Sequence, residues 1–287
     1  MRTYLDCIPC FLRVTLEQGR LLTGDERVHR ELMNEALKLI PGFSLGSTPP
    51  KMMREIQEVI RRRFPDSDPY KKVKDQSNRR AMDLYPALKD KVATSEDRLL
   101  TSVELAIAGN VIDYAAKNNL NVEHEIQGIL AGGPTVQEKN VFEYDLFRKE
   151  LARAKTVLYV ADNAGEIVFD RILIEEIAAG RQVTFAVRDK PILNDATCED
   201  AFFCGVDKVA RVISSGVDAP GTVLEYCTDE FMHIFRDADL VIRKGQGNYE
   251  AMSEAPGRKI CFLFKVKCPV IALHSGARMG DIVLKHI

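Results

Sequence analysis

The sequence predicts an α/β fold: a Rossmann-like domain with a mostly parallel sheet, preceded by a helical N-terminal domain. Apolar residues of the first half recur at the spacing of amphipathic helices, whereas the second half contains short apolar runs. Helical stretches separate several of these runs, and an alternation of strands and helices is typical of a parallel, doubly wound sheet. We place the helical domain at residues 1–140 and the Rossmann-like domain at residues 141–287.

Helices and strands can be placed along the chain from apolar spacing and from Pro and Gly punctuation. The segments with helical spacing are Phe11–Leu22, Val28–Ile40, Lys51–Arg63, Ala81–Lys91, Arg98–Asn118 and Val141–Ala154. The expected strands are Thr156–Ala161, Gln182–Val187, Lys208–Ile213, Leu240–Ile242 and Lys259–Phe264, with Val270–Leu273 as a further candidate.

The composition is that of an ordinary globular protein, with 46% hydrophobic and 29% charged residues. The 40 basic and 42 acidic residues leave a formal net charge of −2, which gives no reason to expect nucleic-acid binding. No apolar run is long enough for a transmembrane helix, and Asp6 stands where a signal peptide needs an apolar core. We therefore expect a cytoplasmic protein without a membrane partner, and its seven cysteines should be mostly reduced thiols.

Polar clusters recur directly after the expected strands. Parallel strands in a doubly wound sheet end at the same edge, so these clusters should meet there. They are Asp162-Asn163-Ala164-Gly165-Glu166 after the first strand, Arg188 to Asp195 after the second, Ser214-Ser215-Gly216 after the third, Lys244 to Glu250 after the fourth, and Lys265 after the fifth.

The residue types in these clusters suit a metal ion and a phosphate group. Carboxylate and amide oxygens are preferred by Mg²⁺, Mn²⁺ and similar divalent ions. Lysines and glycine-loop amides suit phosphate oxygens, and Gly165 opens a helix whose N-terminal dipole favours an anion. Each cluster alone is explained as well by a turn or a helix cap. Their convergence at one edge favours the functional interpretation.

Other features leave alternatives open. Asn110 and Asp113 share one face of an apolar helix, either as a buried hydrogen-bonded pair or as one wall of a cleft. Cys7 and Cys10 suit a structural role or local pairing, metal binding, or redox work, although no second CxxC or CxxH pair completes a zinc site. The isolated histidines and the absence of GxSxG argue against a His-based or serine-hydrolase mechanism.

Together these clusters resemble the metal-dependent damage-control phosphatase family. The matching segments follow the family's order and are Gly109-Asn110-x-x-Asp113, Asp162-Asn163-x-Gly165, Leu193-Asn194-Asp195-Ala196-Thr197 and Lys244-Gly245-x-Gly247-Asn248-Tyr249. The N-terminal Cys-x-Pro-Cys is similar to the mark of the family's prokaryotic branch. Each motif alone is weak, and their ordered combination carries the resemblance.

The resemblance implies a helical domain packed on a Rossmann-like domain, with the active site between them. It implies a divalent metal ion, Mn²⁺, Ni²⁺, Co²⁺ or Mg²⁺, held by Asp162, Asn163 and Asp195. Phosphate or substrate contacts are implied for Lys265, Asn110, Asp113, Gly165, Lys244, Gly245 and Asn248. Family members hydrolyse phosphate monoesters, including sugar phosphates and phosphopantetheine-like metabolites, and a role in removing damaged or surplus phosphometabolites is implied for this chain.

A mechanism follows as a hypothesis. A metal-positioned water attacks in line while Lys265 and loop amides stabilise charge on the phosphoryl oxygens. Lys265 is preferred to Lys267 because it directly ends the strand, and Glu166 and Asp113 are both candidates for the general base. Two other functions compete. One is a nucleotide-binding oxidoreductase, which the absence of GxGxxG after the first strand disfavours, and the other is a non-catalytic, metal-dependent metabolite-binding protein.

Overall fold

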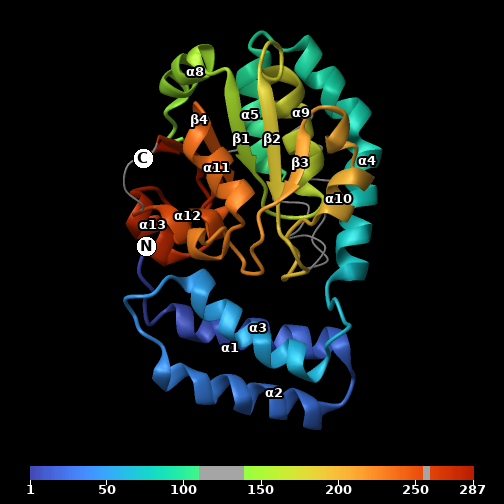
Figure 1. The fold of residues 1–287 in the computed structure, drawn as a ribbon, viewed down its shortest axis with the longest axis vertical. Coiled ribbons are helices and arrows are strands. Elements are labelled where there is room, and N and C mark those ends of the chain that lie inside the picture. The colour runs from blue at the N-terminus through green and yellow to red at the C-terminus, as the bar shows by residue number, and fades with distance from the viewer. Residues whose placement is uncertain (110–138, 255–258) are drawn as a thin grey trace.

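The structure is a computed structural model that describes residues 1–109, 139–254 and 259–287. In this part of the chain, six strands form one sheet in the order β3-β2-β1-β4-β5-β6. Strands β1 to β5 are parallel and β6 runs antiparallel to β5, which confirms the predicted fold class (Figure 1). The strands are β1 Thr156–Val160, β2 Gln182–Val187, β3 Arg211–Ser214, β4 Leu240–Lys244, β5 Ile260–Lys265 and β6 Ile282–His286.

Helices cover both faces of this sheet and also form a separate layer at one end (Figure 1). They are α1 Cys7–Leu22, α2 Glu26–Leu39, α3 Pro49–Arg63, α4 Lys71–Thr94, α5 Arg98–Ala108, α8 Tyr144–Arg153, α9 Glu166–Ile177, α10 Cys198–Phe203, α11 Asp229–Asp237, α12 Gln246–Met252 and α13 Pro269–Ser275, with short 3₁₀ turns at Ile40–Gly42, Val206–Lys208 and Leu224–Tyr226.

The alternation of side chains along each strand produces two cores, one on each face of the sheet. Val157 and Tyr159 of β1 pack in the core formed with α4, α5, α8 and α9. Leu158 and Val160 point to the other face, where α11, α12 and α13 cover them. Because both faces are covered, the central strands are apolar on both sides, and this is why they appear in the sequence as continuous apolar runs.

Helices α1, α2 and α3 form their own small core around Phe11, Met52 and Ile56. They lie across the end of the sheet toward which the parallel strands point (Figure 1). Two ion pairs attach α3 to the loop that follows β3: Arg54 contacts Asp218 at 2.5 Å and Arg61 contacts the same carboxylate at 2.7 Å. The sheet edge that carries the predicted site therefore faces a helical layer.

Two details of the sequence prediction were wrong. Val270–Leu273, the candidate strand, lies inside helix α13, because Pro269 occupies the first turn, where its fixed φ and missing N–H suit a helix start. The antiparallel strand β6 was not predicted. The division at residue 140 stays a prediction, and α4 and α5 share their apolar core with the sheet rather than with α1 to α3.

Candidate active site

The predicted site lies where the chain leaves β1 and β4. These strands are neighbours, but β2 and β3 extend the sheet to one side and β5 to the other. Ligands in open α/β sheets bind at such a switch point, outside the carboxyl ends of the strands. The loop that follows β2 also reaches this point, because Ala196 donates its N–H to the Asp162 carbonyl at 2.8 Å and Ala164 donates to the Asn194 carbonyl at 2.9 Å.

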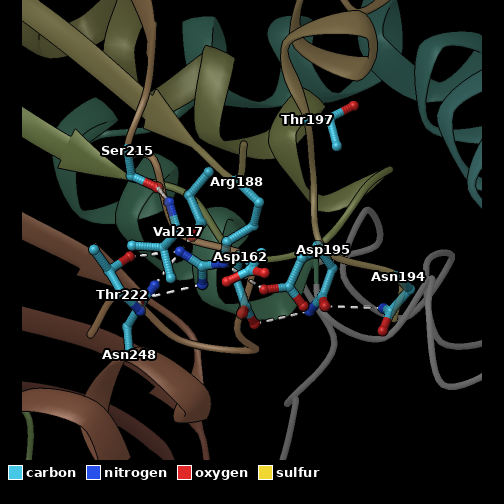
Figure 2. Close-up of polar contacts among 12 residues, drawn as sticks. Asp162, Arg188, Asn194, Asp195, Thr197, Ser215, Val217, Thr222 and Asn248 are labelled. Atoms are coloured by element: carbon cyan, nitrogen blue, oxygen red, sulfur yellow. Dashed lines mark hydrogen bonds and ion pairs between the residues drawn. The ribbon is translucent and has the colours of Figure 1, made fainter. Parts of the chain in front are cut away.

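The structure brings together Asp162, Asn163 and Asp195, the three residues predicted to hold a metal ion. Only 8%, 6% and 3% of their respective surfaces are exposed. Figure 2 shows Asp162 and Asp195 side by side. The Asn163 Nδ2 donates to Asp162 Oδ2 at 2.8 Å and to Glu166 Oε2 at 3.0 Å. The Asn163 Oδ1 in turn accepts from Asn194 Nδ2 at 2.8 Å. Carboxylate and amide oxygens from two loops thus gather in one nearly buried place.

This place carries an excess of negative charge. Burial raises the pKa of Asp162 well above its ordinary value, and the carboxylates of Glu166 and Asp195 raise it further. The positive charges of Lys267 and Arg188 oppose this shift without cancelling it. A divalent cation would relieve the repulsion, and the hard oxygen donors are of the type that Mg²⁺ or Mn²⁺ prefers. The donor set therefore fits the implied metal.

The fit depends on the amide oxygen of Asn163. Across residues 1–109, 139–254 and 259–287, no three His, Cys, Asp or Glu side chains form a group that could hold a metal ion by themselves. The thiols of Cys7 and Cys10 accordingly belong to no such group, and burial raises the pKa of Cys7 to about 11. Both are free thiols in this structure, and the three alternatives, a structural role or local pairing, metal binding and redox work, stay predictions.

At two positions of the predicted motifs only glycine fits, because a Cβ atom would collide with a neighbouring residue. Gly245 has φ +81° and ψ 161°, and a Cβ atom there would lie 1.9 Å from Asp162 Oδ2. At Gly165, with φ +78°, a Cβ atom would lie 2.9 Å from Ser77 of α4. The N–H of Gly165 donates to Asn78 Oδ1 at 2.6 Å, so this amide already has a partner. The predicted phosphate contacts of both glycines stay predictions.

Arg188 belongs to this site and was not among the predicted functional residues. It is 1% exposed, and its Nε donates to Asp195 Oδ2 at 2.7 Å (Figure 2). Its other nitrogens donate to Thr222 Oγ1 and to Asn248 Oδ1. The sequence signal was its place as the first polar residue after β2, but no motif distinguished it from the exposed Asp189 and Lys190 beside it.

Asn248 and Lys244, both predicted to contact phosphate, are fully buried. Asn248 Nδ2 donates to the carbonyls of Ala161 and Lys244, while its Oδ1 accepts from Arg188 and from the Thr222 N–H. Lys244 Nζ donates to the Ala106 carbonyl, Glu166 and Asp170. Direct phosphate contact would disrupt these bonds, so for both residues that role stays a prediction.

Comparison with known proteins identifies the family along nearly the whole chain. A family model described as the damage-control phosphatase ARMT1-like domain matches residues 3–283. The chain belongs to this family. Its resemblance to the family was already visible in the ordered motifs around Asp162, Asp195 and Gly245.

Relatives of this damage-control phosphatase domain align along most of their length. An uncharacterized protein of Methanocaldococcus jannaschii is 35% identical, over 97% of this chain and 93% of its own. The damage-control phosphatase of Archaeoglobus fulgidus is 34% identical, over 97% of each chain. The solved structure of a DUF89 family protein from Pyrococcus horikoshii superposes with a TM-score of 0.87 and 30% identity, over 99% of this chain and 98% of that one.

The remaining site predictions for this damage-control phosphatase concern cations and the segment after α5. Lys265 is half-exposed at the end of β5, and Lys267 is exposed two residues later. The positive charge of Lys267 lowers the pKa of Asp162, against the larger effect of burial. Asn110 and Asp113 lie outside the described residues. No described helix is both long and apolar enough to span a membrane.

Proposed function

We propose that this damage-control phosphatase hydrolyses small phosphate monoesters with a divalent metal ion held by Asp162, Asn163 and Asp195. Mn²⁺, Ni²⁺, Co²⁺ and Mg²⁺ are the candidate ions, and sugar phosphates or phosphopantetheine-like metabolites are the candidate substrates. The observation that carries the proposal is geometric: two carboxylates and a carboxamide from two loops converge in one nearly buried place at the switch point of the sheet. The Cys7-x-Pro-Cys10 segment supports assignment to the prokaryotic branch of the family.

The chemistry divides between the ion and the protein. A bound divalent ion supplies a Lewis acid for the phosphoryl oxygens and lowers the pKa of a coordinated water. Arg188 holds the Asp195 carboxylate in place from the buried side. Gly245 leaves the space that the Asp162 carboxylate occupies. A lysine at or just after the end of β5 then binds the phosphate. Lys267 is a candidate for this role as well as the predicted Lys265, because the positive charge of Lys267 acts on Asp162.

Of the two alternative functions, the oxidoreductase loses support and the non-catalytic binding protein is left to a turnover assay. An oxidoreductase would place a glycine-rich dinucleotide loop after β1, where this chain has Asp162-Asn163-Ala164-Gly165. A Gly165 amide that already bonds Asn78 is a poor substitute for such a loop. A metabolite-binding protein without catalysis would use the same cluster of carboxylates, and it differs from the phosphatase only in its lack of turnover.

The test is a panel of phosphate monoesters assayed with each of the four metal ions and with chelator. Asp162→Ala and Asp195→Ala should each lower kcat/KM at least 100-fold, because each removes a negatively charged ligand. Asp189→Ala is the matched control: this exposed carboxylate lies in the same loop as Asp195 but bonds Ser214, so activity should be unchanged. Full activity in both site variants, or equal loss in the control, would reject the assignment.

A further inference from the structure

A row of buried polar side chains extends from the candidate metal site into the core, and the proposed chemistry does not use it. Glu166 and Asp170 lie one turn apart on α9, and Lys244 ends β4. Lys244 Nζ donates to Glu166 Oε1 and to Asp170 Oδ1, both at 2.6 Å. The Tyr159 hydroxyl donates to the same Asp170 oxygen at 2.7 Å. None of these side chains is more than 1% exposed.

Lys244, which is fully buried, determines which atoms donate and which accept along the row. A lysine ammonium group can only donate, so the Glu166 oxygen that faces Lys244 must accept. The other Glu166 oxygen then accepts from Asn163 Nδ2 at 3.0 Å. The second proton of that nitrogen goes to Asp162 Oδ2. A carboxamide with its nitrogen held between two carboxylates must turn its oxygen away from them.

The oxygen of Asn163 is the atom that a metal ion needs, because the amide nitrogen has no lone pair to offer. The Asn194 Nδ2 donates to this Oδ1 and so supports the same orientation from the opposite side. Reversal of the amide would place two nitrogens against each other at Asn194 and an oxygen against Glu166. Three neighbours, Asp162, Glu166 and Asn194, therefore agree on one of the two orientations.

We propose that Glu166, held by Lys244, is a positioning residue that fixes the Asn163 carboxamide with its oxygen toward the metal ion, and that Glu166 is not the general base. This inference rests on the proposed function, since it needs Asn163 to be a ligand. It gives Lys244 a role in the interior in place of a phosphate contact. Partners of this kind that orient metal ligands typically change metal affinity 10- to 100-fold when they are replaced.

Glu166→Gln tests the inference because it changes the polarity and hardly changes the shape. Lys244 takes the single glutamine oxygen, so the glutamine nitrogen faces Asn163 and forces its amide to turn. We expect Mn²⁺ affinity, measured by titration calorimetry, to fall about 10- to 100-fold. Glu176→Gln is the matched control, since Glu176 lies on the same helix and pairs with Arg98. Its Mn²⁺ affinity should equal that of the wild type.

The double variant Asn163→Asp with Glu166→Gln exchanges the donor and the acceptor. The glutamine nitrogen can then donate to the new carboxylate, whose second oxygen faces the ion, and the net charge is that of the wild type. Both Glu166→Gln and the double variant lose the hydrogen bond from Asn163 Nδ2 to Asp162 Oδ2, so the comparison between them does not depend on it. Affinity should return to within a few-fold of the wild-type value. If the double variant binds Mn²⁺ no better than Glu166→Gln alone, orientation is not what Glu166 supplies.

Lys244→Met separates positioning from simple electrostatics. Removal of a positive charge beside the site should strengthen cation binding if charge alone matters, whereas loss of the anchor for Glu166 should weaken it. Circular dichroism monitors the fold of each variant. If Lys244→Met does not fold, the Mn²⁺ affinity of the double variant Asn163→Asp with Glu166→Gln tests the positioning role by itself. Unchanged Mn²⁺ affinity with lost turnover in Glu166→Gln would make Glu166 the base and overturn the inference. Wild-type affinity in Asp162→Ala would instead reject the proposed function.

Discussion

Replacement of Gly245 by alanine tests how closely the backbone after β4 must approach the Asp162 carboxylate. Gly245 has φ +81° and ψ 161°, a region of backbone conformation that is essentially restricted to glycine. A Cβ atom at this position would lie 1.9 Å from Asp162 Oδ2 and 2.1 Å from its Cγ. The variant therefore combines backbone strain with displacement of a proposed metal ligand.

The size of the effect follows from these distances. The backbone strain alone costs about 1–3 kcal/mol of folding free energy. To restore ordinary contact with the new methyl group, the carboxylate must move by about 1.5 Å. A binding site tolerates a shift of roughly 0.5 Å in its ligands, and misplacement by about 1 Å can lower a rate 100-fold. We expect Gly245→Ala to lose Mn²⁺ binding and about 99% of its activity.

The assays are urea unfolding, Mn²⁺ titration calorimetry and phosphatase turnover. Gly276→Ala is the control, because Gly276 also has a positive φ of +79° at the end of α13, but its Cβ would meet no atom of the described residues within 4 Å. It should cost about 1–2 kcal/mol of stability and leave metal binding unchanged. If Gly245→Ala binds Mn²⁺ as tightly as Gly276→Ala, the inferred contact between Gly245 and the metal ligand is wrong.

Other predictions concern the charges around the site and the attachment of α3. Arg188→Met should cost about 3–5 kcal/mol without metal, since it breaks a buried ion pair to Asp195, and Mn²⁺ should recover part of this loss. Arg211→Met, at an exposed pair, should change stability by less than about 0.5 kcal/mol in urea unfolding. Burial raises the pKa of Asp218, but Arg54 and Arg61 outweigh it and hold the pKa below its usual 3.8. The ionised Asp218 therefore contributes its full share to folding stability above pH 3.8, and this contribution is lost as the pH falls through the folded-state pKa. In unfolding curves across pH, Asp218→Asn should therefore be less stable than wild type by about 1 kcal/mol at pH 7, and the difference should disappear as the pH falls through the folded-state pKa of Asp218. Saturating Mn²⁺, at about 100 times its Kd, should raise the wild-type free energy of unfolding by about 2.7 kcal/mol, and a chelator should remove the gain.

The sequence was a good guide to the parallel strands and a poor guide to the sheet's edge. Strands β1, β2, β4 and β5 are buried on both faces, and this gives each a continuous apolar run that stands out from the surrounding helices. The run Val270–Leu273 has the same composition, but Pro269 begins a helix there. The order of the strands follows from tertiary packing, which no local pattern records.

The site was predictable where local chain geometry sets it. Asp162 and Asn163 lie just after β1, so the sheet itself places them. Asp195 lies in the loop after β2, and the hydrogen bond from the Ala196 N–H to the Asp162 carbonyl holds that loop beside them. The roles of Arg188 and Lys244 depend on which way a side chain turns after the strand. A lysine in a glycine-rich turn resembles a phosphate ligand, and only the buried carboxylates on α9 show that Lys244 faces the core.

Hydrolysis, as we propose it, depends on a divalent ion held by Asp162, Asn163 and Asp195. Calorimetric titration of the chelator-treated protein with Mn²⁺ tests this claim directly, with turnover of a phosphate monoester measured on the same samples. We predict one ion bound per wild-type chain, activity that returns with occupancy, and neither binding nor turnover in Asp162→Ala and Asp195→Ala. Full turnover in the metal-free wild type, or Mn²⁺ binding that survives both substitutions, would contradict the claim.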